Sequence, residues 1–321
     1  MNSEGGRIWR IHESVSDTPR APGALYAQND RFLDVRTPFD EKRGYATIGV
    51  LMFSWLAYSF GFWIVGTIIF LIEREGSAGR YISGAIMILS CLFMLVILSP
   101  VLYFIFRIET FVQRRLIVRF DRINRKVYLH RPRYAGGVVA LDWEKVIVDE
   151  HEDGADQIGL PLFLTWYPKD TPHKRGEGLL LGRNAHDVSD NRHFWEFIRR
   201  FMEDGPQSVP RQKLIGKIPW PWRPLLSVLG TQRAVFESRH WGMAFAVVLM
   251  LPAFALYAVF QWISLLLCWE PVFPRKIRKA CGESFLAVLQ ARGIDLIAWS
   301  MLGGVIYWLD ATFPTLFTFT L

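Results

Sequence analysis

Three long runs of the sequence contain no Asp, Glu, Lys or Arg, and they constrain the fold more than any other feature. They span residues 44–72, 81–106 and 241–269 and hold 29, 26 and 29 residues. About 20 consecutive apolar residues are enough for a helix to cross the hydrocarbon core of a bilayer. We therefore expect the runs to form membrane helices.

The rest of the 321-residue chain has the composition of a water-soluble protein. All 37 Lys and Arg and all 30 Asp and Glu lie outside the three runs. The hydrophobic content excludes a disordered tail protein, and three cysteines are too few for a disulfide-stapled secreted domain. We expect an α+β membrane protein in which a soluble part is joined to apolar helices.

The residues around the first two runs predict their orientation. The short polar stretch 73–80 separates the runs, which favours a transmembrane helical hairpin over residues 44–106. Basic residues flank this hairpin on both outer sides: Lys42, Arg43, Arg107, Arg114 and Arg115. Because an excess of Lys and Arg marks the cytoplasmic side, both ends of the hairpin are expected in the cytosol. Residues 1–43 lack the apolar stretch of a signal peptide and are expected to be a polar cytosolic segment.

The third run leaves two topologies open. If residues 241–269 cross the membrane once, the basic stretch 274–279 lies outside, against the positive-inside rule. Either the run kinks at Pro252 and dips back, or a fourth apolar segment at 296–321, with Asp310 as its one charged residue, returns the chain. We expect residues 241–321 to form a C-terminal membrane region and favour four membrane segments in total.

Residues 107–208 carry the pattern of a cytosolic β-rich domain. Short β-branched and aromatic runs separated by Asn, Asp and Gly predict about six antiparallel strands. Helical spacing of apolar residues then predicts a helix over 189–203, with Ser189 as its N-cap and a stop at Gly205. Strands followed by one closing helix are the element order of a pleckstrin-homology-like (PH-like) domain. That similarity concerns packing and carries no function.

A basic, Trp- and Pro-rich linker follows at residues 209–240. Indole rings and Lys or Arg side chains suit the headgroup layer of a membrane, so Trp220, Trp222 and Arg223 are candidate lipid contacts. The alternative interpretation is that the linker only connects the β-rich domain to the third run.

Four residues of the β-rich domain are candidates for a partner-binding surface. Trp143, Trp166 and Tyr167 are aromatic residues near predicted strand ends, and His151 lies in an acidic stretch. Such groups at strand ends and loops commonly carry recognition. Trp143 and Trp166 alternate with polar neighbours, so they equally suit a core.

The sequence carries no nucleophile, phosphate-loop or metal-ligand signature that we recognise. We therefore expect no enzyme activity, no cofactor and no metal site, and we interpret the acidic stretch at 149–156 as an exposed loop. The runs hold no Asp, Glu, Lys, Arg or His, which disfavours a channel or pump. A net charge of +7 is explained by basic residues beside the membrane, so nucleic acid is not an expected partner.

Three stretches together resemble a known family. They are VRFDRINRKVYLHRPRYAGGVVALDW, HFWEFIRRFMEDGP and EPVFPRKIRKACG. The chain resembles, over most of its length from about Asp30, an uncharacterised family of proteobacterial membrane proteins with two N-terminal spans and a domain of unknown function. Members of that family are frequently encoded beside type VI secretion genes. The resemblance implies a Gram-negative inner-membrane protein associated with contact-dependent secretion.

These observations favour a non-enzymatic, multi-pass inner-membrane protein whose cytosolic domain binds a protein partner. The partner would be a type VI effector or secretion component, and the chain would act as an immunity or accessory protein. Small residues such as Gly61 and Gly66 would also let helices of the chain, or of a second copy, pack closely. An alternative is a membrane-organising module that binds anionic lipid through the PH-like domain. A membrane-acting toxin or pore is the third hypothesis.

Overall fold

The chain folds into two compact units, seen in a computed structural model. The model describes residues 6–9, 11–40, 43–74, 107–151, 161–183, 188–237 and 241–312, with scattered positions between 84 and 104. The first unit, here called the β unit, comprises Met1–Lys42, Gln113–Ile218 and Trp269–Leu321. The second, the helical unit, comprises Arg43–Val112 and Pro219–Cys268. The helical unit is thus built from two inserts in the sequence of the β unit: the α1 insert (43–112) and the α4–α5 insert (219–268).

The helical unit contains α1 (Tyr45–Arg74), α4 (Trp222–Glu237) and α5 (Trp241–Leu266). Within α1 and α5, Ala46–Thr67 and Ala244–Leu266 are long and apolar enough to cross a membrane. A third such helix, α7 (Phe285–Thr312), belongs to the β unit. Residues 75–80 and most of the expected second span at 81–106 lie outside the described residues. So does the end of the expected fourth segment, residues 313–321.

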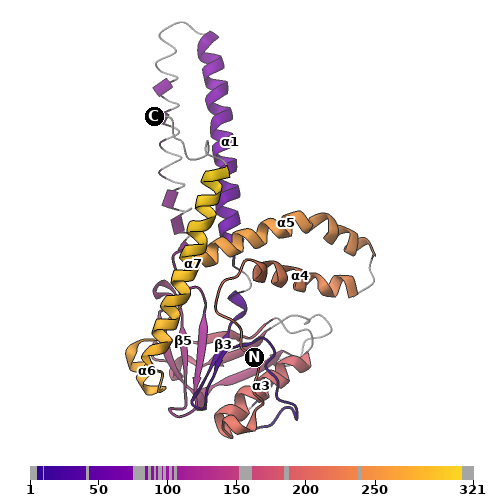
Figure 1. Cartoon of the computed structure of the whole chain (residues 1–321), viewed down its shortest axis with the longest axis vertical. Coiled ribbons are helices and arrows are strands. Elements are labelled where there is room, and N and C mark those ends of the chain that lie inside the picture. Colours follow the sequence, from indigo (N-terminus) through magenta and orange to yellow (C-terminus); the bar gives the residue numbers. More distant parts are fainter. Residues whose placement is uncertain are drawn as a thin grey trace. The chain divides into compact units, whose positions relative to one another are not determined.

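A five-stranded antiparallel sheet forms the centre of the β unit (Figure 1). Its strands follow the order of the chain. They are β2 (Leu25–Gln28), β3 (Phe32–Arg36), β4 (Ile117–Asp121), β5 (Lys126–His130) and β6 (Val138–Asp142). β3 pairs directly with β4, with Arg36 opposite Ile117, although the whole α1 insert separates these strands in sequence.

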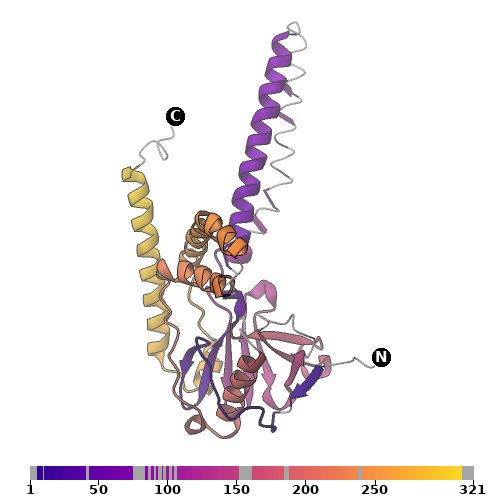
Figure 2. The ribbon, with the colours of Figure 1, turned by 90° about the vertical axis from the view of Figure 1, so that its right-hand side faces the viewer.

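A second, four-stranded antiparallel sheet has the order β1-β7-β8-β9. Its strands are β1 (Gly6–Trp9), β7 (Ile147–His151), β8 (Leu162–Trp166) and β9 (Glu177–Leu181). Two further helices complete the β unit, α3 (Val188–Glu203) and α6 (Arg275–Ala280), and Figure 2 shows α3 against the strands. Short 3-10 helices lie at Pro38–Asp40, Arg133–Ala135, Trp143–Lys145, Pro168–Asp170 and Pro206–Ser208.

One hydrophobic core is shared by the two sheets and α3. Trp143 and Trp195 lie at its centre with ring centroids 5.4 Å apart, and Phe120 meets Trp143 edge to face at 5.9 Å. The indole N–H of Trp143 donates to the Glu203 carboxylate at 2.6 Å. A buried indole needs such an acceptor. This hydrogen bond therefore also holds the end of α3 against the core.

The strands and the helix of residues 107–208 lie where the sequence pattern placed them, β4 to β9 and then α3. The sequence analysis missed β1, β2 and β3, because residues 1–43 were interpreted only as a polar segment. Four-residue strands such as β1 and β2 are too short to show a clear period of two. In β3 the apolar alternation is hidden because both faces are buried: Leu33 and Val35 enter the shared core, and Asp34 is buried on the opposite face.

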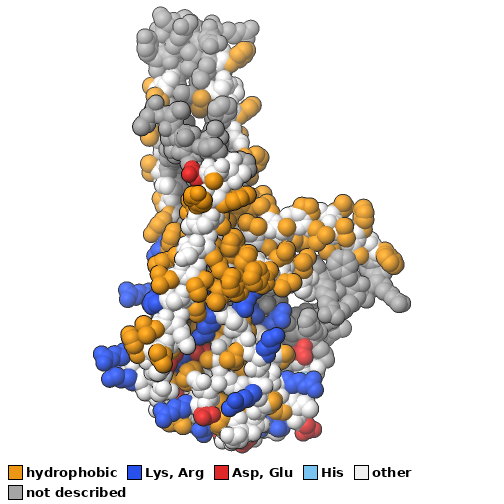
Figure 3. Space-filling model, viewed as in Figure 1, with side chains coloured by type: hydrophobic (Ala, Val, Ile, Leu, Met, Phe, Trp, Pro, Cys, Tyr) orange, Lys and Arg blue, Asp and Glu red, His pale blue; other side chains and the backbone are white. Residues whose placement is uncertain are grey.

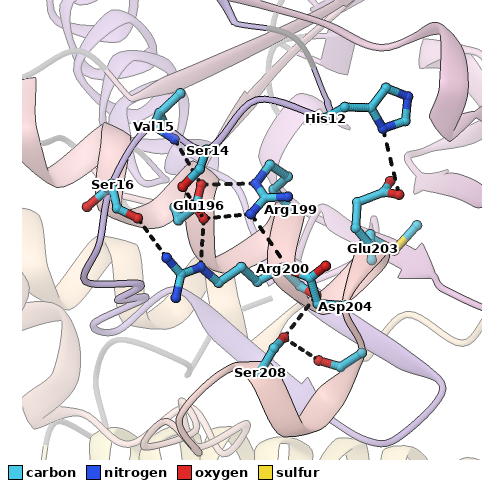
Figure 4. Close-up of polar contacts among 12 residues, drawn as sticks. His12, Ser14, Val15, Ser16, Glu196, Arg199, Arg200, Glu203, Asp204 and Ser208 are labelled. Carbon is cyan, nitrogen blue, oxygen red and sulfur yellow. Dashed lines mark hydrogen bonds and ion pairs between the residues drawn. The ribbon is translucent and has the colours of Figure 1, made fainter.

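The buried carboxylate of Glu196 joins α3 to the N-terminal segment (Figure 4). It accepts hydrogen bonds from Arg199 at 2.7 and 3.0 Å and from Arg200 at 2.6 Å. Ser14 Oγ and the Val15 N–H also donate to it, at 3.0 and 3.1 Å. Burial alone would raise the pKa of Glu196, but these bonds outweigh it and lower the pKa to about 2.

Glu196→Gln is expected to destabilise the β unit, by about 2 kcal/mol, because it leaves two partly buried arginines without their carboxylate. A lowered pKa stabilises the fold above the ordinary carboxyl pKa, and this stabilisation is lost as pH falls towards 2. The difference in melting temperature between wild type and variant should therefore shrink below about pH 4.5. Tryptophan fluorescence of the full-length protein in detergent measures it.

Glu144→Gln is the matched control, because the Glu144 side chain is about half exposed and its ion pair with Arg125 is screened by water. Equal melting temperatures for Glu196→Gln and Glu144→Gln at pH 7 would contradict the role given to Glu196.

Candidate functional site

The outer face of the five-stranded sheet, opposite the shared core, is covered by the segment that follows Trp269. Tyr26, Phe32 and Tyr128 project from this face and pack with Phe273 and Cys281. In Figures 1 and 2 the first half of α7 also runs beside this sheet. The sheet therefore has two buried faces, which is why every residue of β4 is buried.

Arg119 lies at the centre of this outer face. Its guanidinium makes a two-pronged ion pair with Asp34 on the neighbouring strand, at 2.7 and 2.8 Å, and its Nη1 donates to Glu283 at 2.6 Å. It also lies 3.9 and 4.3 Å from the ring centroids of Phe32 and Phe273. Burial alone would lower the pKa of Arg119, but the two carboxylates raise it above its ordinary value. Arg119 is thus a permanent positive charge between two acids.

Next to Arg119, Asp121 organises a second polar group. Cys281 Sγ donates to its carboxylate at 3.2 Å, and the side-chain amide of Asn124 donates at 2.6 Å. Burial and the hydrogen bond to Asp121 raise the pKa of Cys281 to about 12. Burial and the charge of Asp121 likewise raise the pKa of Tyr128 to about 12. The thiol therefore stays protonated at neutral pH, which makes it a poor nucleophile.

A second buried ionic network, here called the arginine–glutamate network, lies at the start of the segment that returns from α5. Arg114 Nη1 is 3.4 Å from both Glu270 and Asp295, and Arg115 pairs closely with Glu270. The Glu270 N–H donates to Asp295 at 2.6 Å, and Arg292 pairs with Asp295 at 2.8 Å. Asp295 is a residue of α7, so this network fixes that apolar helix to the β unit.

The same arginines hold three parts of the backbone together. The Arg114 N–H donates to the Trp269 carbonyl at 2.6 Å, and Gln113 and Trp269 form a parallel β-bridge. Arg115 also donates to the Lys217 carbonyl. The chain therefore leaves the β unit after Lys217 and returns at Trp269 beside Arg114 and Arg115.

A pocket of about 860 Å³ lies between the outer face of the sheet and α7. This volume is in the range of small-molecule sites, about 300–1,000 Å³. Charged residues Asp34, Arg119, Glu270 and Glu283 contribute to its lining. Apolar residues complete it on both sides, among them Tyr26, Phe32, Ile117, Leu286, Ile294 and Ile297. Because its arginine and carboxylates already pair within the two networks, the pocket suits an amphipathic ligand or a partner side chain.

The candidate residues from the sequence do not gather at this pocket. Trp143 and Trp166 are completely buried in the shared core, in line with their alternative interpretation as core residues. Tyr167 is 52% exposed, with the Lys169 amine 5.6 Å from its ring centroid. His151 ends β7, opposite Gly6.

The three linker candidates lie in the helical unit. The rings of Trp220 and Trp222 stack with centroids 4.8 Å apart, and the Arg223 N–H donates to the Trp220 carbonyl at 3.1 Å. They form a compact aromatic turn at the start of α4.

The sequence analysis missed the residues of both buried networks. A usable signal was present: Asp34 and Arg119 are charged residues inside otherwise apolar strands, and they lie opposite each other in the register of β3 and β4. Without β3, however, Arg119 had no visible partner. Glu270 is the first charged residue after the third uncharged run. Its role as a partner of Arg114 and Arg115 can be recognised only once the chain is known to return beside Arg114.

Residues 93–284 match the model of a family of unknown function, DUF6708. The chain belongs to this family. The match includes Arg114, Arg115, Arg119, Glu270 and Glu283, so most of both networks lies in the part that defines the DUF6708 family. No curated protein and no solved structure matches the chain.

Arg119→Leu is expected to destabilise the β unit of this DUF6708 protein by about 3–5 kcal/mol, because it leaves Asp34 and Glu283 buried without their counter-charge. The triple variant that adds Asp34→Asn and Glu283→Gln should recover part of this loss. Thermal unfolding of the full-length protein measures both. Arg122→Gln serves as a control, because Arg122 is only partly buried and its side chain donates to a carbonyl at 3.3–3.4 Å. Equal stability of Arg119→Leu and Arg122→Gln would refute the role of Arg119.

Proposed function

We propose that this protein is a non-enzymatic, multi-pass protein of the bacterial inner membrane, whose β unit lies on the cytoplasmic face and binds a protein partner. The observation that carries the proposal is the arginine–glutamate network. It joins α7, a helix with the length and apolarity of a membrane span, to the rest of the β unit through buried ion pairs. A soluble domain held in this way is displayed at the membrane surface.

Two features of the fold support the finer parts of the proposal. The pairing of β3 with β4 supports a transmembrane hairpin for the N-terminal apolar runs 44–72 and 81–106, because these two strands flank the runs. A chain that leaves and rejoins one sheet crosses a membrane an even number of times. Two antiparallel sheets and the helix α3, which share one core, support a PH-like interpretation of the β unit.

The chemistry of the buried groups supports binding rather than catalysis. Arg119 keeps its charge, the Cys281 thiol is held protonated, and the carboxylates of the two networks are paired with arginines. Catalytic acids, bases and nucleophiles need a pKa near the working pH. These groups are better suited to holding elements in place.

Exposed aromatic residues on the loops of the β unit supply a partner surface. Tyr134 and Tyr167 are 59% and 52% exposed and lie after β5 and β8. Tyrosine is enriched among the residues that dominate binding energy at protein interfaces. The resemblance to a family encoded near type VI secretion genes suggests the partner: an effector that this protein neutralises as an immunity protein, or handles as an accessory protein.

Co-expression with the toxin encoded by a neighbouring gene tests this proposal. The wild-type chain is expected to restore growth, and Tyr167→Ala should lower the number of surviving cells at least about tenfold if Tyr167 is a central contact, since about 1.4 kcal/mol is tenfold in affinity. Ile123→Ala is the matched control, because Ile123 is also exposed, in the turn after β4. Correct membrane insertion without any protection would rule out immunity.

A second candidate function is the binding of anionic lipid, and α6 favours it. This short helix exposes Arg275, Lys276 and Lys279 directly before α7 begins. Clustered basic side chains at the root of a membrane helix attract anionic headgroups. Full-length protein purified from membranes should retain more anionic lipid than its Arg275→Gln, Lys276→Gln, Lys279→Gln variant, as quantified by mass spectrometry. Equal lipid retention would count against this function.

A further inference from the structure

The α4–α5 insert leaves the β unit and returns to it at one place. Arg115 contacts the β unit on both sides of this insert. It donates to the carbonyl of Lys217, before the insert, and pairs with Glu270, after it. Because Lys217 and Glu270 both contact Arg115, the two ends of the insert must lie on the same side of any membrane. The insert therefore crosses an even number of times or not at all.

Contacts inside the helical unit support the same conclusion independently. The indole N–H of Trp262, near the end of α5, donates to the carbonyl of Pro219, just before α4, at 2.8 Å. The α4–α5 insert thus closes on itself as a helical hairpin (Figure 1). The Arg115 contacts lie within the β unit, and the Trp262 hydrogen bond lies within the helical unit.

Helix α4 is unsuited to crossing a bilayer. Its 16 residues give a helix of about 24 Å at 1.5 Å per residue, shorter than the hydrocarbon core of about 30 Å. A crossing that began at Trp222 would place Arg233 about 16 Å deep, near the bilayer centre. A charge there costs about 2.5–3.5 kcal/mol even on the lowest scales. Glu237 would add a second charge.

If α4 does not cross, α5 cannot cross either, because a single crossing would leave the two ends of the insert on opposite sides. Yet α5 has no charged residue, and only a small share of its apolar window is buried within the protein. Figure 3 shows its apolar side chains on the surface of the molecule. The helix needs apolar surroundings that a single leaflet can provide without a crossing.

We propose that the α4–α5 hairpin lies along the leaflet on the side of the β unit, with its polar link at the level of the headgroups, and returns without crossing the membrane. This inference rests on the proposed function only in placing the protein in a membrane. The acyl chains of that one leaflet are the partner. The exposed apolar residues of both helices form the contact surface: Trp222, Leu226, Trp241, Phe245, Leu249 and Leu256.

This topology also accounts for the basic stretch 274–279. With a non-crossing hairpin, α6 and its exposed lysines stay on the side of the β unit, as the positive-inside rule requires. The sequence placed a possible reversal at Pro252, but Pro252 lies inside the continuous helix α5, so the reversal lies between α4 and α5 instead. The inferred topology has one membrane segment fewer than the four that the sequence favoured.

The α1 insert differs from the α4–α5 insert in one respect. It too closes on itself, because the Glu109 carboxylate accepts from the Gly44 and Thr47 N–H groups at 2.9 and 3.0 Å. It contains two uncharged runs of spanning length, however, so it can cross twice and still return. The α4–α5 insert contains one such run and cannot.

The test labels a thiol in the link between α4 and α5. A hydrophilic Gly-Ser-Cys-Ser-Gly sequence is inserted after Ser238 in a full-length chain that carries Cys91→Ser, Cys268→Ser and Cys281→Ser. A membrane-impermeant maleimide is added to spheroplasts or to inverted membrane vesicles. Lys276→Cys reports the side of the β unit, and Ser77→Cys, in the stretch 73–80, reports the opposite side.

The inserted thiol is expected to label with Lys276→Cys in inverted vesicles and to remain unlabelled in spheroplasts. Labelling in spheroplasts together with Ser77→Cys would overturn the inference while leaving the proposed membrane protein intact. If the chain is instead released from membranes by alkaline carbonate, the proposed function fails, and the inference falls with it.

Discussion

The structure depends on the point where Arg114 and Arg115 meet Glu270. Arg114 receives the returning backbone at Trp269 and reaches Asp295 on α7, whereas Arg115 holds Glu270 and the Lys217 carbonyl. Through these two neighbouring residues, the end of the α1 insert, both ends of the α4–α5 insert and the root of α7 are brought together. Without this network, the segments of the β unit that flank the two inserts would lack these buried partners.

Buried ion pairs are a costly way to build such a junction. Removing two charges from water costs several kcal/mol per ion, and well-packed apolar residues of similar volume often stabilise a fold as much or more. A junction of apolar side chains next to long apolar helices, however, would pack in many registers. Charged groups with fixed partners specify one arrangement. Arg119, paired with Asp34 and Glu283, specifies the position of the segment that covers the sheet. We infer that both networks specify how distant parts of the chain pack, since each joins residues far apart in sequence.

The sequence predicted the elements well where local pattern decides them. The uncharged runs 44–72 and 241–269, the period-two strands from Ile117 onward and the helix around Trp195 all have signals inside a short window. Strands β1 and β2 were missed because they are short, and β3 was missed because both of its faces are buried. The two networks were missed for a different reason: the partners of Arg119 and Arg115 lie far away in sequence, at Glu283 and Glu270. Only the fold shows that these charges meet, and that the two inserts return where they began.

The most direct test of this account asks whether Gln113 and Trp269 are neighbours in the native membrane. In a cysteine-free background, Gln113→Cys with Trp269→Cys should react efficiently with a short thiol cross-linker, as detected by mass spectrometry of the digested protein. Lys126→Cys with Asp142→Cys, a directly opposed pair on β5 and β6, gives the reference yield. A cross-linking yield comparable to that reference would support the junction. A high yield for the reference pair and none for Gln113 and Trp269 would contradict it.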